Sequence, residues 1–312
     1  MTIARRILRW GVRIVLGILA FVALLLMVGA GYQAVAGNVD RTRYSPPGRL
    51  VDIGGASLHL YCVGQGSPTV VLEAGLGLGL VTWREVQPQV SQVTRACSYD
   101  LAGYGWSDPG PLPRTSSGIS AELEALLDRA GVQGPYVLVG HSLGGLYARH
   151  FASMHLADVA GMVLVDSTHE RQGAAPSLVL SLTRAANFVG IRRLLFRFGD
   201  DGLNAMYTSN HSSAAANEEF AAVAASFDEV QRVNPSLGDR PLVVITAGQS
   251  DEGEWRALQL DLLTRSTNSR RIVAEGSGHY VHDDRPALVI DVIREVVAKV
   301  TAGLPNTGSA PG

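Results

Sequence analysis

The stretch Tyr136-Val-Leu-Val-Gly-His-Ser-Leu-Gly-Gly145 joins an apolar run, typical of a buried strand, to a helical segment from Leu146 to Met154. Gly140 and Gly144 flank Ser142 with the G-x-S-x-G spacing of a nucleophile elbow, in which the serine has a strained backbone conformation. Larger side chains at the two glycines would make the strand and the helix collide. The pattern is common by chance, but the strand before it and the helix after it favour a serine nucleophile over an ordinary turn.

Length and charge limit the class of protein. A chain of 312 residues forms one large or two small domains with a substantial core. A net charge of −2 and a pI near 6.4 give no electrostatic case for binding nucleic acid. The sequence has no C-x-x-C pattern and no paired His/Cys spacing, which argues against a structural zinc site.

The N-terminal part has the pattern of a membrane anchor. Residues 1–13 are basic, and the run from Ile14 to Ala30 carries no charged side chain. Small residues extend this run, so we expect a transmembrane helix at residues 14–36. The positive-inside rule then puts the N-terminus in the cytoplasm and the remainder outside it. Ala34-Val-Ala36 also has the form of a cleavage site, so a protein secreted after cleavage near Ala36 is the alternative.

The remaining sequence divides into a linker, one domain and a tail. Residues 37–48 are polar and contain prolines, and residues 302–312 are rich in Gly, Pro and Ser. Between them, residues 49–301 alternate strand-like and helix-like segments, except that residues 167–238 contain no clear strand. The expected strands are Arg49–Ile53, Ser57–Val63, Thr69–Glu73, Arg95–Asp100, Tyr136–Val139, Ala160–Asp166, Pro241–Ala247 and Arg271–Ala274. The expected further helices are Trp83–Val93, Ile119–Ala130, Trp255–Leu263 and Pro286–Thr301.

Three blocks of sequence resemble the α/β-hydrolase family. They are Glu73-Ala-Gly-Leu-Gly77, Ser98-Tyr-Asp-Leu-Ala-Gly-Tyr-Gly-Trp-Ser-Asp108 and the stretch around Ser142, in this order and spacing. The resemblance implies an α/β fold with a mostly parallel central sheet flanked by helices, and a helical lid at about 167–238. One departure is visible, because Ala74-Gly75 stands where the family usually has His-Gly.

The same resemblance implies a catalytic triad with Ser142 as nucleophile. His279 follows the last expected strand in a Gly-Ser-Gly-His turn, the family's position for the general base, with His169 and His282 as weaker alternatives. Two carboxylates end strands, and we expect Asp251 to be the acid, with Asp166 as the alternative because some family members use that position. By position, the backbone N–H groups of Leu76 and Leu143 form the oxyanion hole.

The family's strand order also places the two cysteines on neighbouring strands. Cys62 lies on the second expected strand and Cys97 on the fourth. A disulfide between them and a pair of buried thiols are both open at this point. Export of the domain would allow a disulfide to persist.

The expected activity is that of a serine hydrolase acting on an ester-type bond of a small hydrophobic molecule through an acyl-enzyme on Ser142. Amidase, thioesterase or cofactor-free haloperoxidase activity on the same triad is the alternative, as is an inactive membrane-tethered binding protein. A serine nucleophile argues against dehalogenase or epoxide hydrolase chemistry, and we expect no metal and no organic cofactor. Candidate pocket residues in the lid are Leu178, Leu180, Leu182, Phe188, Leu194, Leu195, Phe196 and Met206.

Overall fold

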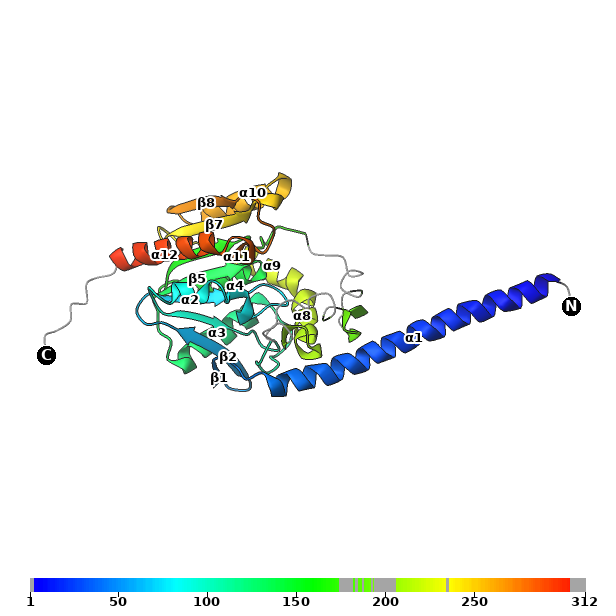
Figure 1. Cartoon of the computed structure of the whole chain (residues 1–312). Helices are drawn as coiled ribbons and strands as arrows, with labels where there is room; N and C mark the ends of the chain where they lie inside the picture. Colours follow the sequence, from blue (N-terminus) through cyan, green and yellow to red (C-terminus); the bar gives the residue numbers. More distant parts are fainter. Residues whose placement is uncertain are drawn as a thin grey trace.

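A sheet of eight strands forms the centre of the computed structural model, which describes residues 3–173, 182, 185–186, 188–191, 193, 206–233 and 236–303 (Figure 1). The strand order is β1-β2-β4-β3-β5-β6-β7-β8. β2 is antiparallel to β1 and β4, and all other neighbours are parallel. The strands are β1 (Arg49–Asp52), β2 (Ser57–Val63), β3 (Thr69–Glu73), β4 (Ala96–Tyr99), β5 (Tyr136–His141), β6 (Val159–Val165), β7 (Leu242–Ala247) and β8 (Ser269–Ala274). This arrangement confirms the predicted fold class.

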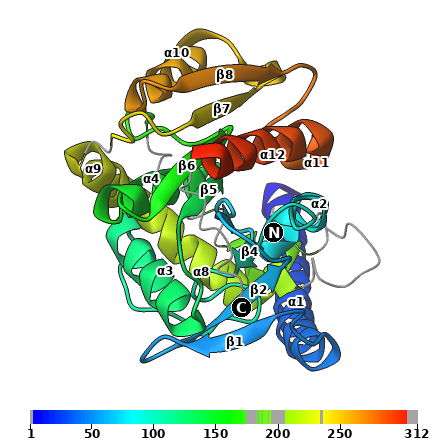
Figure 2. The same cartoon turned by 90° about the vertical axis from the view of Figure 1, so that its left-hand side faces the viewer.

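Helices cover both faces of the sheet (Figure 2). One face carries α3 (Ser116–Ala130), α4 (Leu143–Met154) and α9 (Val223–Val233), and the other carries α2 (Gln87–Val90) and α12 (Pro286–Gly303). The central strands are apolar at successive positions because each face needs its own core. In β5, Leu138 packs into the cluster with α3 and α4, whereas Val137 and Val139 pack into the cluster with α12.

The remaining short elements differ in part from the sequence prediction. The helix expected at Trp83–Val93 is wrong, because the segment forms the 3₁₀ helix η1 (Leu80–Trp83) and the single-turn α2, which has Pro88 in its first turn. A proline is tolerated there but not in a helix interior. The other elements are α8 (Asn210–Ala221), η2 (Gly248–Ser250), α10 (Gly253–Asp261), η3 (Leu262–Arg265) and α11 (Val281–Asp284).

One long helix, α1 (Ile3–Arg43), projects from the body of the molecule (Figure 1). It is the single helix in the described part of the chain that is long and apolar enough to cross a membrane, with a mean hydropathy of 2.8 and its apolar window unburied. The helix also includes most of the expected basic segment 1–13. The linker expected at residues 37–48 is wrong up to Arg43, since no proline interrupts helical hydrogen bonding before Pro46.

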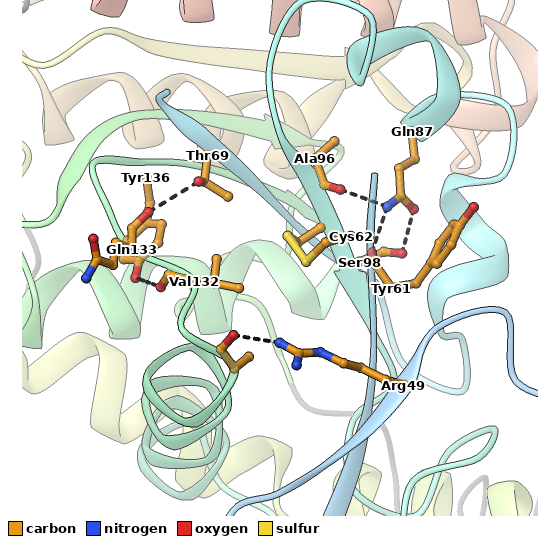
Figure 3. Close-up of a disulfide and its surroundings, with 12 residues drawn as sticks. Arg49, Tyr61, Cys62, Thr69, Gln87, Ala96, Ser98, Val132, Gln133 and Tyr136 are labelled. Carbon is orange, nitrogen blue, oxygen red and sulfur yellow. Dashed lines mark hydrogen bonds between the residues drawn. A yellow bond between two sulfur atoms is a disulfide. The ribbon is translucent and has the colours of Figure 1, made fainter. Parts of the chain in front are cut away.

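The two cysteines form a disulfide between neighbouring strands (Figure 3). Cys62 on β2 faces Cys97 on β4 directly, with their Cα atoms 4.0 Å apart. The side chain of Gln87 joins the same two strands, because its Nε2 donates to the carbonyl oxygens of Tyr61 at 2.8 Å and Ala96 at 3.0 Å. The disulfide and this amide fasten the antiparallel edge to the parallel part of the sheet.

Candidate active site

Ser142 occupies the predicted elbow between β5 and α4. Its backbone has φ 53° and ψ −124°, a left-handed region that is costly for any residue with a side chain. A Cβ on Gly140 would lie 2.5 Å from the Cα of Gly145, and one on Gly144 would lie 2.5 Å from the carbonyl oxygen of Glu73. Both glycines are therefore required by close backbone contacts, as the sequence predicts.

The loop after β3 lies against the elbow. A Cβ on Gly75 would lie 3.0 Å from the Cβ of Ser142, so the loop passes directly beside the serine. Leu76 follows in this loop, and Leu143 is the first residue of α4, where an N–H has no acceptor within its own helix. Among the described residues, neither of these two N–H groups donates a backbone hydrogen bond.

Asp166, at the end of β6, holds His279. The Nδ1 of His279 donates to Asp166 Oδ2 at 2.6 Å, and the Asp166 side chain is almost fully buried. Asp166 Oδ1 accepts from the backbone N–H of Ala247 at 3.0 Å and from the indole N–H of Trp255 at 3.1 Å. Asp166 also has a positive φ of 40°. Three donors thus satisfy one buried carboxylate and fix the His279 ring, leaving its Nε2 for another partner.

The preference for Asp251 over Asp166 is wrong. Asp251 forms an ion pair with Arg271, whose Nη1 and Nη2 donate to the two carboxylate oxygens, the second at 3.1 Å. The hydrogen bonds from Arg271 lower the pKa of Asp251. Arg271 lies on β8, beside β7, so the arginine reaches the loop after β7 and engages its carboxylate.

Two buried imidazoles, those of His141 and His282, lie near the exposed His279. His141 Nε2 donates to the backbone carbonyl of His279 at 3.0 Å, and the His141 and His282 rings are 4.5 Å apart. Burial lowers the pKa of His141 well below its usual range and lowers the pKa of His282 to about 3. His282, one of the alternative bases, is buried against His141 and Trp83, and its Nε2 lies 3.7 Å from the carboxylate of the neighbouring Asp283.

The other alternative base, His169, belongs to a different cluster. Its Nε2 lies 3.0 Å from Asp261 Oδ2, and its ring is fully buried. A salt bridge between Arg149 and Glu170 lies beside it. Arg149 lowers the pKa of Glu170 to about 2 despite the burial of that carboxyl group. This cluster contains no contact to Ser142 among the described residues and has the form of a structural ion-pair network.

The lid residues proposed for the pocket are only partly described. Met206 is buried in the core, whereas Leu182 and Phe188 are exposed. The remaining five predicted positions, Leu178, Leu180, Leu194, Leu195 and Phe196, lie outside the described residues. Within the described residues, no group of three or more His, Cys, Asp or Glu side chains converges to hold a metal ion.

Trp255, which contacts Asp166, and Glu73, whose backbone lies against the elbow, were not among the residues predicted from the sequence. Trp255 lies 89 residues from the carboxylate that it contacts, and no motif marks it. Glu73 ends β3 next to the loop at Gly75, is nearly inaccessible, and has no hydrogen-bond partner for Oε1 among the described residues. Burial raises its pKa to about 8. The sequence signal that could have identified Glu73 is an acidic residue at the end of an otherwise apolar strand.

The comparisons with known proteins point to a single family. The sequence profile described as "Alpha/beta hydrolase family" matches residues 70–292. The chain is 29% identical over 250 residues to the Bacillus subtilis protein named "Uncharacterized protein YqjL", covering 78% of this chain and 89% of that protein.

Solved structures show the same fold. A thermophilic esterase from Thermogutta terrifontis superposes with a TM-score of 0.62 at 22% identity, covering 78% of this chain and 94% of the esterase. Epoxide hydrolase CorEH superposes with a TM-score of 0.65 at 19% identity, covering 81% and 98% of the two chains. At these identities, the likeness extends to the fold and not to the reaction.

Proposed function

The chain belongs to the alpha/beta hydrolase family, and we propose that it is a serine hydrolase that cleaves an ester-type bond of a hydrophobic substrate. The hydrogen bond of 2.6 Å between His279 and Asp166 carries this proposal, because it orients an imidazole from the turn after β8 at the sheet edge where Ser142 stands. A buried carboxylate that fixes one ring nitrogen leaves the other to act as a base.

The proposed reaction proceeds through an acyl-enzyme. Nε2 of His279 takes the proton from Ser142 Oγ as the oxygen attacks the carbonyl carbon. The tetrahedral intermediate collapses when His279 gives that proton to the leaving alcohol. Water then attacks the acyl-enzyme with His279 as base, releasing the acid and restoring the serine. Ser142 and His279 form no mutual hydrogen bond within the described part of the chain, and such contacts often tighten only when substrate binds.

The backbone N–H groups of Leu76 and Leu143 are the proposed oxyanion donors. Leu143 opens α4, so the partial positive charge of the helix N-terminus adds to its N–H. The contact of Gly75 with Ser142 supports placing Leu76 within reach of the same oxyanion. One such donor contributes about 3 kcal/mol to transition-state stabilisation.

The helix α1 is the proposed membrane anchor, with the N-terminus in the cytoplasm and the hydrolase domain on the other side. Arg5, Arg6, Arg9 and Arg13 precede the apolar run, in keeping with the positive-inside rule. An anchored hydrolase with exposed apolar side chains on its lid suits a hydrophobic small-molecule ester. Amides, thioesters and peracid formation are the other reactions that this triad would support.

Labelling with a fluorophosphonate probe tests the proposal. We expect the full chain in detergent micelles to be labelled and Ser142→Ala to be unlabelled. Ser153→Ala is the matched control, because Ser153 lies at the far end of α4 and should keep full labelling. Folded wild-type protein that resists the probe would instead favour an inactive binding protein. Labelling of Ser142→Ala would assign the nucleophile elsewhere.

A panel of p-nitrophenyl esters of short and long acyl chains, with matched anilides and thioesters, then separates the reactions. We expect the highest kcat/KM on esters, rising with acyl length.

A further inference from the structure

The C-terminal third of α1 packs against a corner of the lid. Leu182 and Phe188 are in helical conformation, the chain turns at Val189 and Gly190, and helical conformation resumes at Ile191. A Cβ on Gly29 of α1 would lie 2.6 Å from the carbonyl oxygen of Val189, so this contact requires glycine. We call Leu182, Phe188, Val189 and Ile191 the lid corner.

The contacts between α1 and the lid become more polar along the helix. One turn after Gly29, the fully buried Gln33 donates to the carbonyl oxygen of Thr208 and accepts from Arg193 Nε at 2.8 Å. Two turns further, Asp40 accepts from Arg193 Nη1 at 2.6 Å. A close approach of the two backbones is thus followed by a buried amide and then by an ion pair.

This gradient coincides with the expected edge of the bilayer. A hydrocarbon core of about 30 Å is spanned by about 20 helical residues. Counted from Ile14, the first residue after the arginines, such a span ends near Gln33. Gly29 lies about 6 Å inside that limit, at a rise of 1.5 Å per residue, and Asp40 lies about 10 Å outside it. The contact at Gly29 therefore brings Val189 to the depth of the outer acyl chains.

The lid corner carries large apolar side chains that contact little protein. Phe188 is 64% exposed, and Leu182 and Ile191 are also exposed. Exposed apolar side chains beside a helix long and apolar enough to cross a membrane are typical of an interfacial anchor. We propose that the lid corner docks into the outer leaflet of the bilayer that α1 spans, where its side chains contact the acyl chains of the lipids.

Gln33 of α1 accepts from Arg193 beside the lid corner and donates to the backbone of Thr208, which follows Tyr207 in the next described part of the lid. Tyr207 Oη donates to Asp100 Oδ1 at 2.7 Å, and a Cβ on Gly79 would lie 2.2 Å from the Tyr207 ring. Gly79 ends the glycine-rich loop that begins beside Ser142. Docking thus holds the loop that flanks the nucleophile close to the lipid surface, where an amphiphilic ester would be delivered from the leaflet.

Depth measurements on the full chain test this proposal. The two native cysteines are joined, so a single introduced cysteine takes a bimane label under non-reducing conditions. Three variants are reconstituted in phosphatidylcholine vesicles: Phe188→Cys for the lid corner, Leu24→Cys for the middle of α1, and Met154→Cys as control. Met154 is also 64% exposed and lies at the end of α4 opposite Ser142.

Lipids brominated near the headgroup or near the chain ends then quench the label. We expect the Phe188→Cys label to lose about half its fluorescence to the shallow bromines and less to the deep ones, as fits side chains buried 5–10 Å into the boundary. The Leu24→Cys label should respond more to the deep bromines, and the Met154→Cys label to neither.

Three outcomes would overturn the proposal in different ways. Quenching at Leu24 without quenching at Phe188 leaves the anchor intact and removes the docking of the lid corner. A Phe188 label that is shielded from water but not quenched would identify a second copy of the chain as its partner. Absence of quenching at Leu24 as well would reject the anchor itself, on which the docking rests, while leaving the proposed hydrolysis at Ser142 untouched.

Discussion

Asp166 and Asp251 follow neighbouring parallel strands, at the same edge of the sheet, and yet they have different partners. Asp166 directly follows β6 and accepts from His279, Trp255 and the backbone N–H of Ala247. Asp251 follows β7 and is held by Arg271. One carboxylate is bonded to an imidazole and the other to a guanidinium, so the arrangement of donors, rather than position after a strand, separates the proposed catalytic acid from the acid paired with Arg271.

The largest expected difference in activity is between the variant that removes the charge of Asp166 and the variant that removes the charge of Asp251. Asp166→Asn should lower kcat/KM for a p-nitrophenyl ester by about 10⁴-fold, because the His279 ring loses the acceptor that fixes its tautomer and stabilises its cation. Asp251→Asn should leave kcat/KM within about twofold, since its partner Arg271 is not part of the reaction. The rate of fluorophosphonate labelling gives the same ranking without a substrate. A larger loss of kcat/KM in Asp251→Asn than in Asp166→Asn would contradict the roles proposed for the two carboxylates.

Glu73 is a buried carboxyl group that, among the residues that the structure describes, is paired with neither an imidazole nor a guanidinium. Its pKa, raised to about 8 by burial, lies above that of an unfolded glutamate, so the folded state keeps a proton that the unfolded state loses. Stability is therefore greatest below about pH 4.5 and falls as pH rises towards 8, by about 3–5 kcal/mol in total. Glu73→Gln should remove this part of the pH dependence.

Urea unfolding of the wild type and Glu73→Gln in micelles, at pH 5 and pH 8, measures that difference. Parallel pH profiles for the two proteins would mean that Glu73 is ionised in the folded state and would contradict the prediction.

Trp255→Phe sharpens the description of the Asp166 site. The substitution removes one of three donors to the carboxylate and keeps an aromatic ring, so we expect kcat to fall about tenfold with little change in KM, the cost of one hydrogen bond to a charged group. Trp106→Phe is the control, because its indole N–H donates to the carbonyl of Tyr44 instead. Equal losses from both substitutions would reduce Trp255 to a packing role.

The smallest effect is expected at the Asp251 pair. Arg271→Gln should lower the free energy of unfolding at neutral pH by about 1 kcal/mol or less and leave kcat unchanged. Because Arg271 lowers the folded-state pKa of Asp251, this stabilisation is present above the unfolded pKa of about 3.9 and is lost as the pH falls through the folded pKa. Unfolding at pH 6 and pH 3 should therefore show a shrinking difference. A loss of activity in Arg271→Gln would connect the pair to the reaction.

Local sequence patterns predicted most of the sheet and the strained turn at Ser142. Thr69–Glu73 has the predicted bounds because an apolar run with β-branched residues is itself the signal for a buried strand. The elbow at Ser142 was predicted because the G-x-S-x-G spacing is local, although the contact that requires Gly144 is with the distant backbone of Glu73. The helix expected over Trp83–Val93 failed where Pro88 competed with the apolar pattern.

The sequence by itself determined most of the strands, the elbow at Ser142 and the apolar helix before the domain, since each has a pattern within a short segment, whereas the mostly parallel fold was implied by the family resemblance. Only the tertiary structure decided between Asp166 and Asp251. Hydrogen bonds act over about 3 Å, and the one between Asp166 and His279 joins residues 113 positions apart. Asp251, the alternative acid, is instead paired with Arg271, a residue of β8 that no sequence motif marks. Such choices follow from which donors the sheet brings together.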